Sequence, residues 1–119
     1  MKIYIAGKMR GVPYYNFPAF DEAKKKLQAS GWEVQSPADM DRMVGFDAMA
    51  CKSNHDWNST PDGFSKIDCV TRCIEAVMVC DAIYMLDGWD KSKGARAEKA
   101  VAEWMGKDVI YDNDQNKNI

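Results

Sequence analysis

The sequence lacks an excess of charge of either sign. Its 16 Lys and Arg residues and 18 Asp and Glu residues give a formal net charge of −2, which provides no electrostatic basis for binding nucleic acid or an anionic membrane. Long hydrophobic runs are also missing. No stretch could span a bilayer, and the apolar part of the first residues is too short for a signal peptide. We therefore expect a cytoplasmic protein.

Cysteine and histidine are scarce, with four residues and one residue respectively. In a reducing cytosol the cysteines are expected to be free thiols. Cys69, Cys73 and Cys80 recur at helical spacing, for which core packing is the ordinary explanation. Cys51 and His55 have a separation typical of metal ligands, but no second pair accompanies them. We therefore expect neither a metal nor a cofactor.

With 119 residues, the chain is long enough for one domain, residues 1–119, with a single core. Short stretches rich in β-branched, aromatic and apolar side chains predict strands. These strands lie at residues 2–6, 32–35, 82–86 and 108–111. Apolar residues at helical spacing predict helices at 17–30, 68–79 and 94–105. The alternation indicates an α/β fold, a parallel sheet with helices on both faces.

The second and third predicted helices carry apolar faces that should turn toward the core. On the helix at 68–79 the face comprises Val70, Cys73, Ile74, Val77 and Met78. On the helix at 94–105 it comprises Ala97, Val101, Trp104 and Met105. Glu98 shares this face with Val101, three residues later, although a solvated glutamate would normally lie opposite it.

Two interpretations of Glu98 stay open. Ser92 is the expected N-cap of its helix, so Glu98 can be a partly exposed carboxylate that the helix dipole favours. Alternatively, it points toward the strand ends as a potential nucleophile or base. The first interpretation explains why Glu98 lies near the helix start but not why it lies on the apolar face.

Three segments rich in glycine, proline or charge follow the predicted strands, where parallel sheets bind their ligands. They are residues 7–11 (GKMRG), 36–41 (SPADMD) and 87–94 (DGWDKSKG). In the first, a tight turn with Arg10 could hold a phosphate. A glycine turn with two solvated cations, Lys8 and Arg10, is an equal alternative, because neither P-loop nor GxGxxG spacing is present.

Residues 41–66 are long for a connection between a strand and a helix. Aromatic residues in this segment argue against complete disorder. One interpretation is a flap that hinges near Gly45 and Gly63 and places Trp57 or Phe64 against a base. An inert surface loop is as good an explanation.

Several stretches resemble the nucleoside 2-deoxyribosyltransferase superfamily, namely YIAGKMRG near the start and CDAIYML followed by DGWDKSKGARAE. This superfamily includes the 2'-deoxynucleoside 5'-phosphate N-hydrolases, and the likeness is closest to its small, often phage-borne members. It covers most of the chain outside 41–66. The resemblance implies a Rossmann-like, flavodoxin-like sheet of about four to five strands, and a bacterial or phage-infected host cytosol as location.

The resemblance also implies roles for particular residues. Glu98 would be the nucleophile on C1' of the sugar, with Tyr4 positioning the sugar or the glutamate and Asp87 beside the base or sugar. Arg10 and Ser92 would bind the 5'-phosphate. The other residues implied in substrate or phosphate binding are Gly7, Lys8, Met9, Gly11, Pro37, Gly88, Trp89 and Gly94.

One position departs from the relatives, which often carry an aspartate where this chain has Cys73. A thiol is a poor substitute for an acid that protonates a leaving base, although Asp68 or Asp87 could compensate. Two functions therefore stay open. One is cleavage of the N-glycosidic bond of a (deoxy)nucleoside 5'-monophosphate, by hydrolysis or base transfer. The other is a non-catalytic nucleotide-binding protein, a sensor or sponge.

The expected partner is a small-molecule nucleotide. A homodimer or higher homo-oligomer is expected mainly because relatives complete the site with a neighbouring subunit. Tyr14, Tyr15, Trp57 and Phe64 add support, since loops of a monomer would leave these aromatics in water.

Overall fold

The computed structural model describes residues 1–9, 12–43 and 66–112. The elements in chain order are β1 (Lys2–Ala6), α1 (Phe17–Ala29), β2 (Glu33–Gln35), α2 (Pro37–Met43), α3 (Lys66–Val79), β3 (Ala82–Met85), α4 (Lys93–Trp104) and β4 (Asp108–Tyr111). Short 3₁₀ turns at Pro13–Asn16 and Trp89–Lys91 precede α1 and α4. The predicted α/β fold is confirmed, and among the α-helices and strands of the described residues α2 alone was not expected from the sequence.

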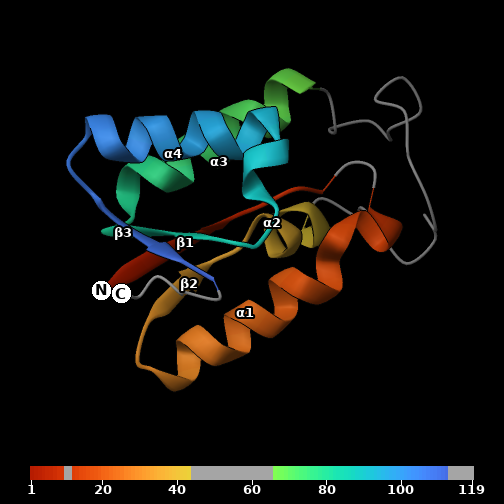
Figure 1. The fold of residues 1–119 in the computed structure, drawn as a ribbon, viewed down its shortest axis with the longest axis horizontal. Coiled ribbons are helices and arrows are strands. Elements are labelled where there is room, and N and C mark those ends of the chain that lie inside the picture. The colour runs from red at the N-terminus through yellow and green to blue at the C-terminus, as the bar shows by residue number, and fades with distance from the viewer. Residues whose placement is uncertain (10–11, 44–65, 113–119) are drawn as a thin grey trace.

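The described strands form one parallel sheet in the order β2-β1-β3-β4. Tyr4 of β1 pairs with Gln35 of β2 on one side and with Ile83 of β3 on the other. Figure 1 shows α1 on one face of the sheet and α3 and α4 on the opposite face. This is the flavodoxin-like order of a Rossmann-like sheet.

The central strands β1 and β3 are buried on both faces, which explains their nearly continuous apolar sequences. Alternate side chains of a strand turn to opposite faces. Ile3 and Ile5 pack in the cluster that contains Phe20 of α1. Tyr4 and Ala6 pack in the cluster that contains α3 and α4. Each face of the sheet therefore has its own hydrophobic layer.

The buried face predicted for α3 is partly wrong. Val70 and Met78 are 52% and 45% exposed, whereas Ala76 and Val77 are buried against the sheet. Apolar residues occupy most of the circumference of α3, so helical periodicity alone does not single out the face that packs on the sheet.

The prediction for α4 is wrong in the same way. Trp104 is 89% exposed and Met105 is about half exposed, while the helix packs on the sheet through Ala95 and Ala102. These small side chains let α4 lie close to β1 and β3. Within the described ranges, no helix is long and apolar enough to cross a membrane.

Helix α2 replaces the loop that the sequence predicted after the second strand. Its start signals are Pro37 at the first position and Asp39 in the first turn. Arg42 of α2 forms two hydrogen bonds, of 2.9 and 2.7 Å, with the carboxylate of Asp21 in α1. Lys24 of α1 contacts Asp39 at 2.7 Å. These ion pairs attach α2 to α1.

The segment 41–66, for which a flap or an inert surface loop was expected, contains helical residues at both ends. Residues 41–43 belong to α2, and Lys66 begins α3. The rest of this segment lies outside the described residues, together with the hinge glycines, the two aromatics and the Cys51–His55 pair.

Gly7 is required where β1 passes β3. A Cβ atom at Gly7 would lie 2.8 Å from Cδ1 and 2.9 Å from Cβ of Leu86, closer than carbon atoms pack. We predict that Gly7→Ala lowers the free energy of unfolding by ~1–3 kcal/mol, measured by urea denaturation, because the strand ends must move apart.

Gly94→Ala is the matched control for this substitution. A Cβ at Gly94 would meet only the Ser92 Oγ, at 3.9 Å, and alanine is the better helix former. Gly94→Ala should therefore raise stability by roughly 0.5–1 kcal/mol. Equal stabilities for Gly7→Ala and the wild type would contradict the close approach to Leu86.

Candidate functional site

The strand order creates a topological switch point between β1 and β3. The chain leaves β1 toward β2 through α1 on one face, and leaves β3 toward β4 through α4 on the other. The strand ends remain adjacent, because the Leu86 N–H donates to the Ala6 carbonyl at 2.8 Å. Ligands of open α/β sheets bind where connections diverge in this way. The structure thus brings residues 7–9 and 87–92 to one edge.

Glu98 lies just below this edge, between α4 and β1. The hydroxyl of Tyr4, a fully buried side chain in the middle of β1, donates to the Glu98 Oε2 at 3.2 Å. The thiol of Cys73 in α3 hydrogen-bonds to both groups. Strand β1 and helices α3 and α4 therefore each contribute one polar side chain to the same cluster, which we call the Glu98 cluster.

Burial sets the electrostatics of the Glu98 cluster. Loss of water around the carboxyl group raises the pKa of Glu98 to about 7, although the hydrogen bonds from Tyr4 and Cys73 oppose the rise. Burial and the neighbouring carboxylate also raise the pKa of Tyr4 well above its usual value, so this phenol stays neutral. Near neutral pH, Glu98 can thus act as a nucleophile or base when ionised and as an acid when protonated.

Ser92 is the N-cap of α4, as predicted. Its Oγ accepts the N–H of Ala95 at 3.1 Å, and a hydroxyl that accepts can still donate to a ligand. Unpaired N–H groups of the first helical turn favour an anion at the same end. Glu98 is six residues later, about 9 Å along the helix axis, and helical side chains lean back toward the N-terminus.

Gly94 lies in this first turn, and the packing around it does not require a glycine. A Cβ would be accommodated there, and the backbone is in an ordinary helical conformation. Glycine in such a position weakens a helix by roughly 0.5–1 kcal/mol relative to alanine. A ligand that approaches the backbone closely at this position would explain why the residue is a glycine.

Asn16 holds the first loop in place, and the sequence analysis did not identify this role. Its Nδ2 donates to the Lys8 carbonyl at 2.9 Å. Tyr14, Tyr15 and Asn16 all have positive φ angles, of 58°, 54° and 61°, a conformation that costs roughly 1–2 kcal/mol for each non-glycine residue. No sequence pattern signals three left-handed residues in a row. The burial of Tyr15 in the α1-side core offsets part of the cost.

Trp89 lies on the other flank of α4 from Tyr4 and Cys73. Its ring centroid is 6.0 Å from that of Tyr111 in β4, and the Lys99 Nζ lies 5.2 Å from it. Gly88 before it has a φ of 88°, which allows the sharp turn after β3. The predicted contact of Trp89 with a base stays a prediction.

The remaining predicted residues are spread along the same edge of the sheet. Asp87 is exposed at the end of β3, and Pro37 is buried at the start of α2. Met9 packs against the α1-side core, on the opposite face of the sheet from Glu98. Arg10 and Gly11 lie outside the described residues.

Ser36, at the end of β2, is a further candidate that the sequence did not indicate. Its side chain is buried, and its hydroxyl has no hydrogen-bond partner within the described part of the chain. Buried polar groups are normally paired. A ligand at the carboxyl ends of β1 and β2 could supply the partner.

The fold and the switch-point site define an α/β protein with a candidate ligand site at the carboxyl edge of its sheet. Residues 1–111 match the family described as "Domain of unknown function (DUF4406)", and the chain belongs to this family. A comparison with curated proteins finds no match.

We predict that the partly buried carboxyl group of Glu98 makes stability depend on pH. Because the pKa of Glu98 is raised to about 7 from 4.5, the folded protein keeps a proton that the unfolded chain loses. This contribution to stability is fully present below pH 4.5 and is lost as pH rises through 7. Relative to the wild type, Glu98→Gln should therefore gain ~1–3 kcal/mol in unfolding free energy between pH 4.5 and 8.

Urea denaturation across this pH range measures the difference. Glu22→Gln, at an exposed position of α1, provides the baseline for losing a surface carboxylate. Parallel pH curves for Glu98→Gln and the wild type would show that Glu98 is not desolvated.

Proposed function

We propose that the chain binds a nucleoside 5'-monophosphate at the switch point and cleaves its N-glycosidic bond, by hydrolysis or base transfer, with Glu98 as nucleophile. The proposal adopts the resemblance to the nucleoside 2-deoxyribosyltransferase superfamily. The observation that carries it is the hydrogen bond from the Tyr4 hydroxyl to the Glu98 carboxyl group. This bond holds a potential nucleophile between β1 and α4.

The chemistry suits a carboxylate in this position. Cleavage of an N-glycosidic bond develops positive charge at C1' of the sugar, and a nearby carboxylate stabilises it or attacks it. With its pKa at about 7, Glu98 is ionised in a large fraction of molecules at neutral pH. The neutral phenol of Tyr4 can orient the attacking oxygen without adding charge.

A phosphate subsite is proposed at the first turn of α4. Ser92 and the helix N-terminus supply donors there, and Lys8 adds positive charge from the adjacent strand end. The roughly 9 Å along the helix between Ser92 and Glu98 is a span that a ribose 5'-phosphate can bridge. A nucleotide would then place its phosphate at the edge and its C1' near Glu98.

Cys73 favours a second candidate function, a nucleotide-binding protein without turnover. The relatives often have an aspartate at this position, where it can protonate the leaving base. Here a thiol occupies it and contacts Glu98 directly. Asp68 and Asp87 are exposed, so each would need to reach the base from the surface. Loss of the acid would slow cleavage and leave binding intact.

We predict that the protein releases free base and sugar phosphate from at least one nucleoside monophosphate, detected by mass spectrometry after incubation with a panel of these compounds. Glu98→Gln should reduce this rate by at least ~10³-fold, because an amide cannot replace a carboxylate nucleophile. The wild-type kcat/KM should rise with pH through about 7 as Glu98 ionises.

Tyr4→Phe is the control that separates the role of Tyr4 as a hydrogen-bond donor from the role of Glu98 as the nucleophile. Removing the phenol hydrogen bond, which lowers the pKa of Glu98, should move the rising limb to higher pH without abolishing turnover. Unchanged turnover in Glu98→Gln would remove Glu98 from the mechanism. No base release by the wild type, with nucleotide binding intact, would select the non-catalytic function.

We also predict tighter binding of a nucleoside monophosphate than of the free nucleoside, measured by isothermal titration calorimetry. Ser92→Ala and Arg10→Ala should each weaken only the monophosphate, by ~1.5–3 kcal/mol for a charged hydrogen bond. Lys25→Ala, at an exposed position of α1, controls for a general loss of positive charge. Equal affinities for nucleoside and monophosphate would rule out the phosphate subsite.

A further inference from the structure

Two consecutive polar side chains at the carboxyl end of β2 are left unpaired by the fold. Ser36 is 2% exposed, and its hydroxyl has no hydrogen-bond partner within the described part of the chain. The carboxamide of Gln35, partly buried, makes no hydrogen bond to another described residue. A serine just before a helix usually caps it, and buried polar groups are normally paired. The end of β2 therefore presents hydrogen-bonding groups that the described residues do not satisfy.

The strand register turns Gln35 toward the Glu98 cluster. Gln35 of β2 pairs with Tyr4 of β1, and residues paired across parallel strands lie on the same face of the sheet. The preceding pair follows this rule, because Val34 and Ile3 both pack in the α1-side core. Gln35 therefore lies with Tyr4 on the opposite face, the face of α3 and α4, one strand spacing of ~4.8 Å away.

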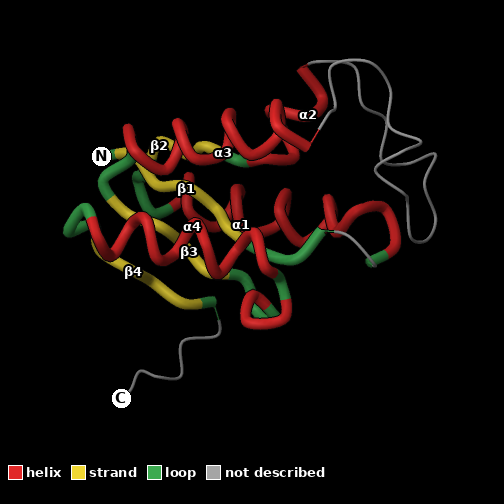
Figure 2. The backbone as a smooth tube through the Cα atoms, turned by 90° about the horizontal axis from the view of Figure 1, so that it is seen from above, coloured by secondary structure: helices red, strands yellow, loops and turns green. Residues whose placement is uncertain are grey.

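Three polar groups then follow one another along the carboxyl edge of the sheet. Figure 2 shows the strands side by side in the order β2, β1, β3 and β4. Ser92 caps α4 after β3, Glu98 contacts β1, and Gln35 ends β2. A nucleoside 5'-monophosphate has its parts in a matching order, since the sugar lies between the phosphate and the base. With the phosphate at Ser92 and C1' near Glu98, the base is directed toward β2.

We propose that Gln35 is a specificity-determining residue, whose carboxamide hydrogen-bonds to the base of the nucleotide. This inference rests on the proposed function. A carboxamide places a donor beside an acceptor, and adenine and cytosine each carry an amino donor beside a ring-nitrogen acceptor. Two parallel hydrogen bonds can then form, without bringing a charge next to Glu98. The Ser36 hydroxyl can rotate to pair with the same base, which would supply the partner that it lacks.

The flank of α4 that faces β4 is less suited to a base. Trp89 lies there, and its ring is already in contact with Tyr111 and with the ammonium group of Lys99. A base stacked on Trp89 would have to displace these contacts. It would also lie on the far side of α4 from Tyr4 and Glu98.

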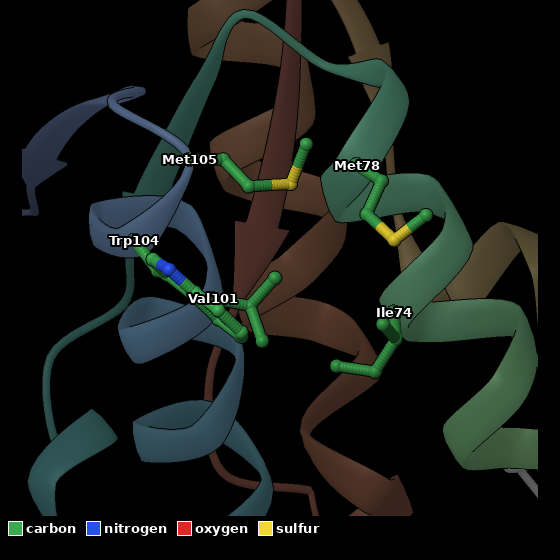
Figure 3. Close-up of a pocket in the computed structure, with 5 residues that line it drawn as sticks. All are labelled: Ile74, Met78, Val101, Trp104 and Met105. Atoms are coloured by element: carbon green, nitrogen blue, oxygen red, sulfur yellow. The ribbon is translucent and has the colours of Figure 1, made fainter.

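The outer side of α3 and α4 has a groove of about 300 Å³, but its chemistry does not suit a base either. The groove is lined by Ile74, Met78, Val101, Trp104 and Met105 (Figure 3). In the figure, the side chains of Val101 and Ile74 extend into the space between the two ribbons. Among these five residues, the indole N–H of Trp104 is the one strong hydrogen-bonding group. The groove therefore lacks the donor and acceptor pair that Gln35 offers.

Isothermal titration calorimetry of the full chain tests the proposal. The ligands are the 5'-monophosphates of the four common nucleosides and ribose 5-phosphate, which has no base. Gln35→Met keeps the length of the side chain but loses the carboxamide. It should weaken the tightest-bound monophosphate by about tenfold and ribose 5-phosphate by less than about twofold. Ser36→Ala should also weaken the monophosphate selectively, with no loss of stability in urea, because an unpaired hydroxyl is removed.

Gln35→Glu provides a second measurement that a merely structural role would not change. A carboxylate only accepts hydrogen bonds, and guanine presents two adjacent donors, N1–H and the N2 amino group. This variant should therefore shift the preference among the monophosphates toward guanine by about tenfold relative to adenine.

Gln28→Met, at an exposed position of α1, is the matched control and should bind every ligand as the wild type does. If Gln35→Met binds all the monophosphates with wild-type affinity, or weakens ribose 5-phosphate equally, this inference alone is overturned. A selective loss in Trp89→Leu would then place the base on the β4 side. A wild type that binds no monophosphate would instead refute the proposed function on which the inference rests.

Discussion

A hydrogen bond of 3.2 Å from the Tyr4 hydroxyl to Glu98 joins the centre of the sheet to helix α4. The Tyr4 side chain is fully buried and Glu98 is partly buried, so pairing the two groups offsets part of the cost of desolvating them. The contact requires α4 to lie close to β1, and the buried alanines of that helix, Ala95 and Ala102, make the close approach possible. The position of α4 in turn fixes its N-terminus, capped by Ser92, at the carboxyl edge of the sheet.

The fold does not need this carboxyl group. An apolar side chain of similar volume at position 98 would pack between α3 and α4 without the cost of desolvating a charge. Desolvation raises the pKa of Glu98, and the hydrogen bonds from Tyr4 and Cys73 only partly offset this rise. Other departures from the most stable choice are the left-handed Tyr14, Tyr15 and Asn16, which precede α1, and the helical Gly94 in the first turn of α4. Such local conflicts gather at functional sites.

Helices α3 and α4 have two apolar sides, and the two sides serve different contacts. The inner sides pack on β1 and β3 mainly through small residues and carry the Glu98 cluster. The outer sides carry larger residues, such as Met78 and Trp104, around an apolar groove. An isolated domain would gain nothing from large apolar groups in water. The same two helices therefore carry both the Glu98 cluster and the exposed apolar groove.

Much of the architecture follows from local patterns in the sequence. Residues 2–6 and 82–86 are apolar almost throughout, because parallel strands in the centre of a sheet are covered on both faces, and this pattern identifies them without tertiary information. The same holds for the N-cap at Ser92 and for the unusual face that Glu98 occupies. Helix α2 was not predicted, because the segment is too short to show a periodic apolar face. Its start signals, Pro37 and Asp39, are ordinary ones.

Only the tertiary structure decided which strands are neighbours and which side of each helix packs on the sheet. The order β2-β1-β3-β4, and with it the switch point, depends on crossovers that leave no local trace in the sequence. The sequence predicted that α3 and α4 have apolar faces but not which side packs on the sheet. Val70, Met78 and Trp104 lie on the outside, because small residues occupy the positions where the helices approach the sheet most closely. Likewise, periodicity can place Glu98 on a face, but the meeting of Tyr4, Cys73 and Glu98 depends on three elements far apart in the chain. Burial and partners are properties of that packing, and they set the pKa of Glu98.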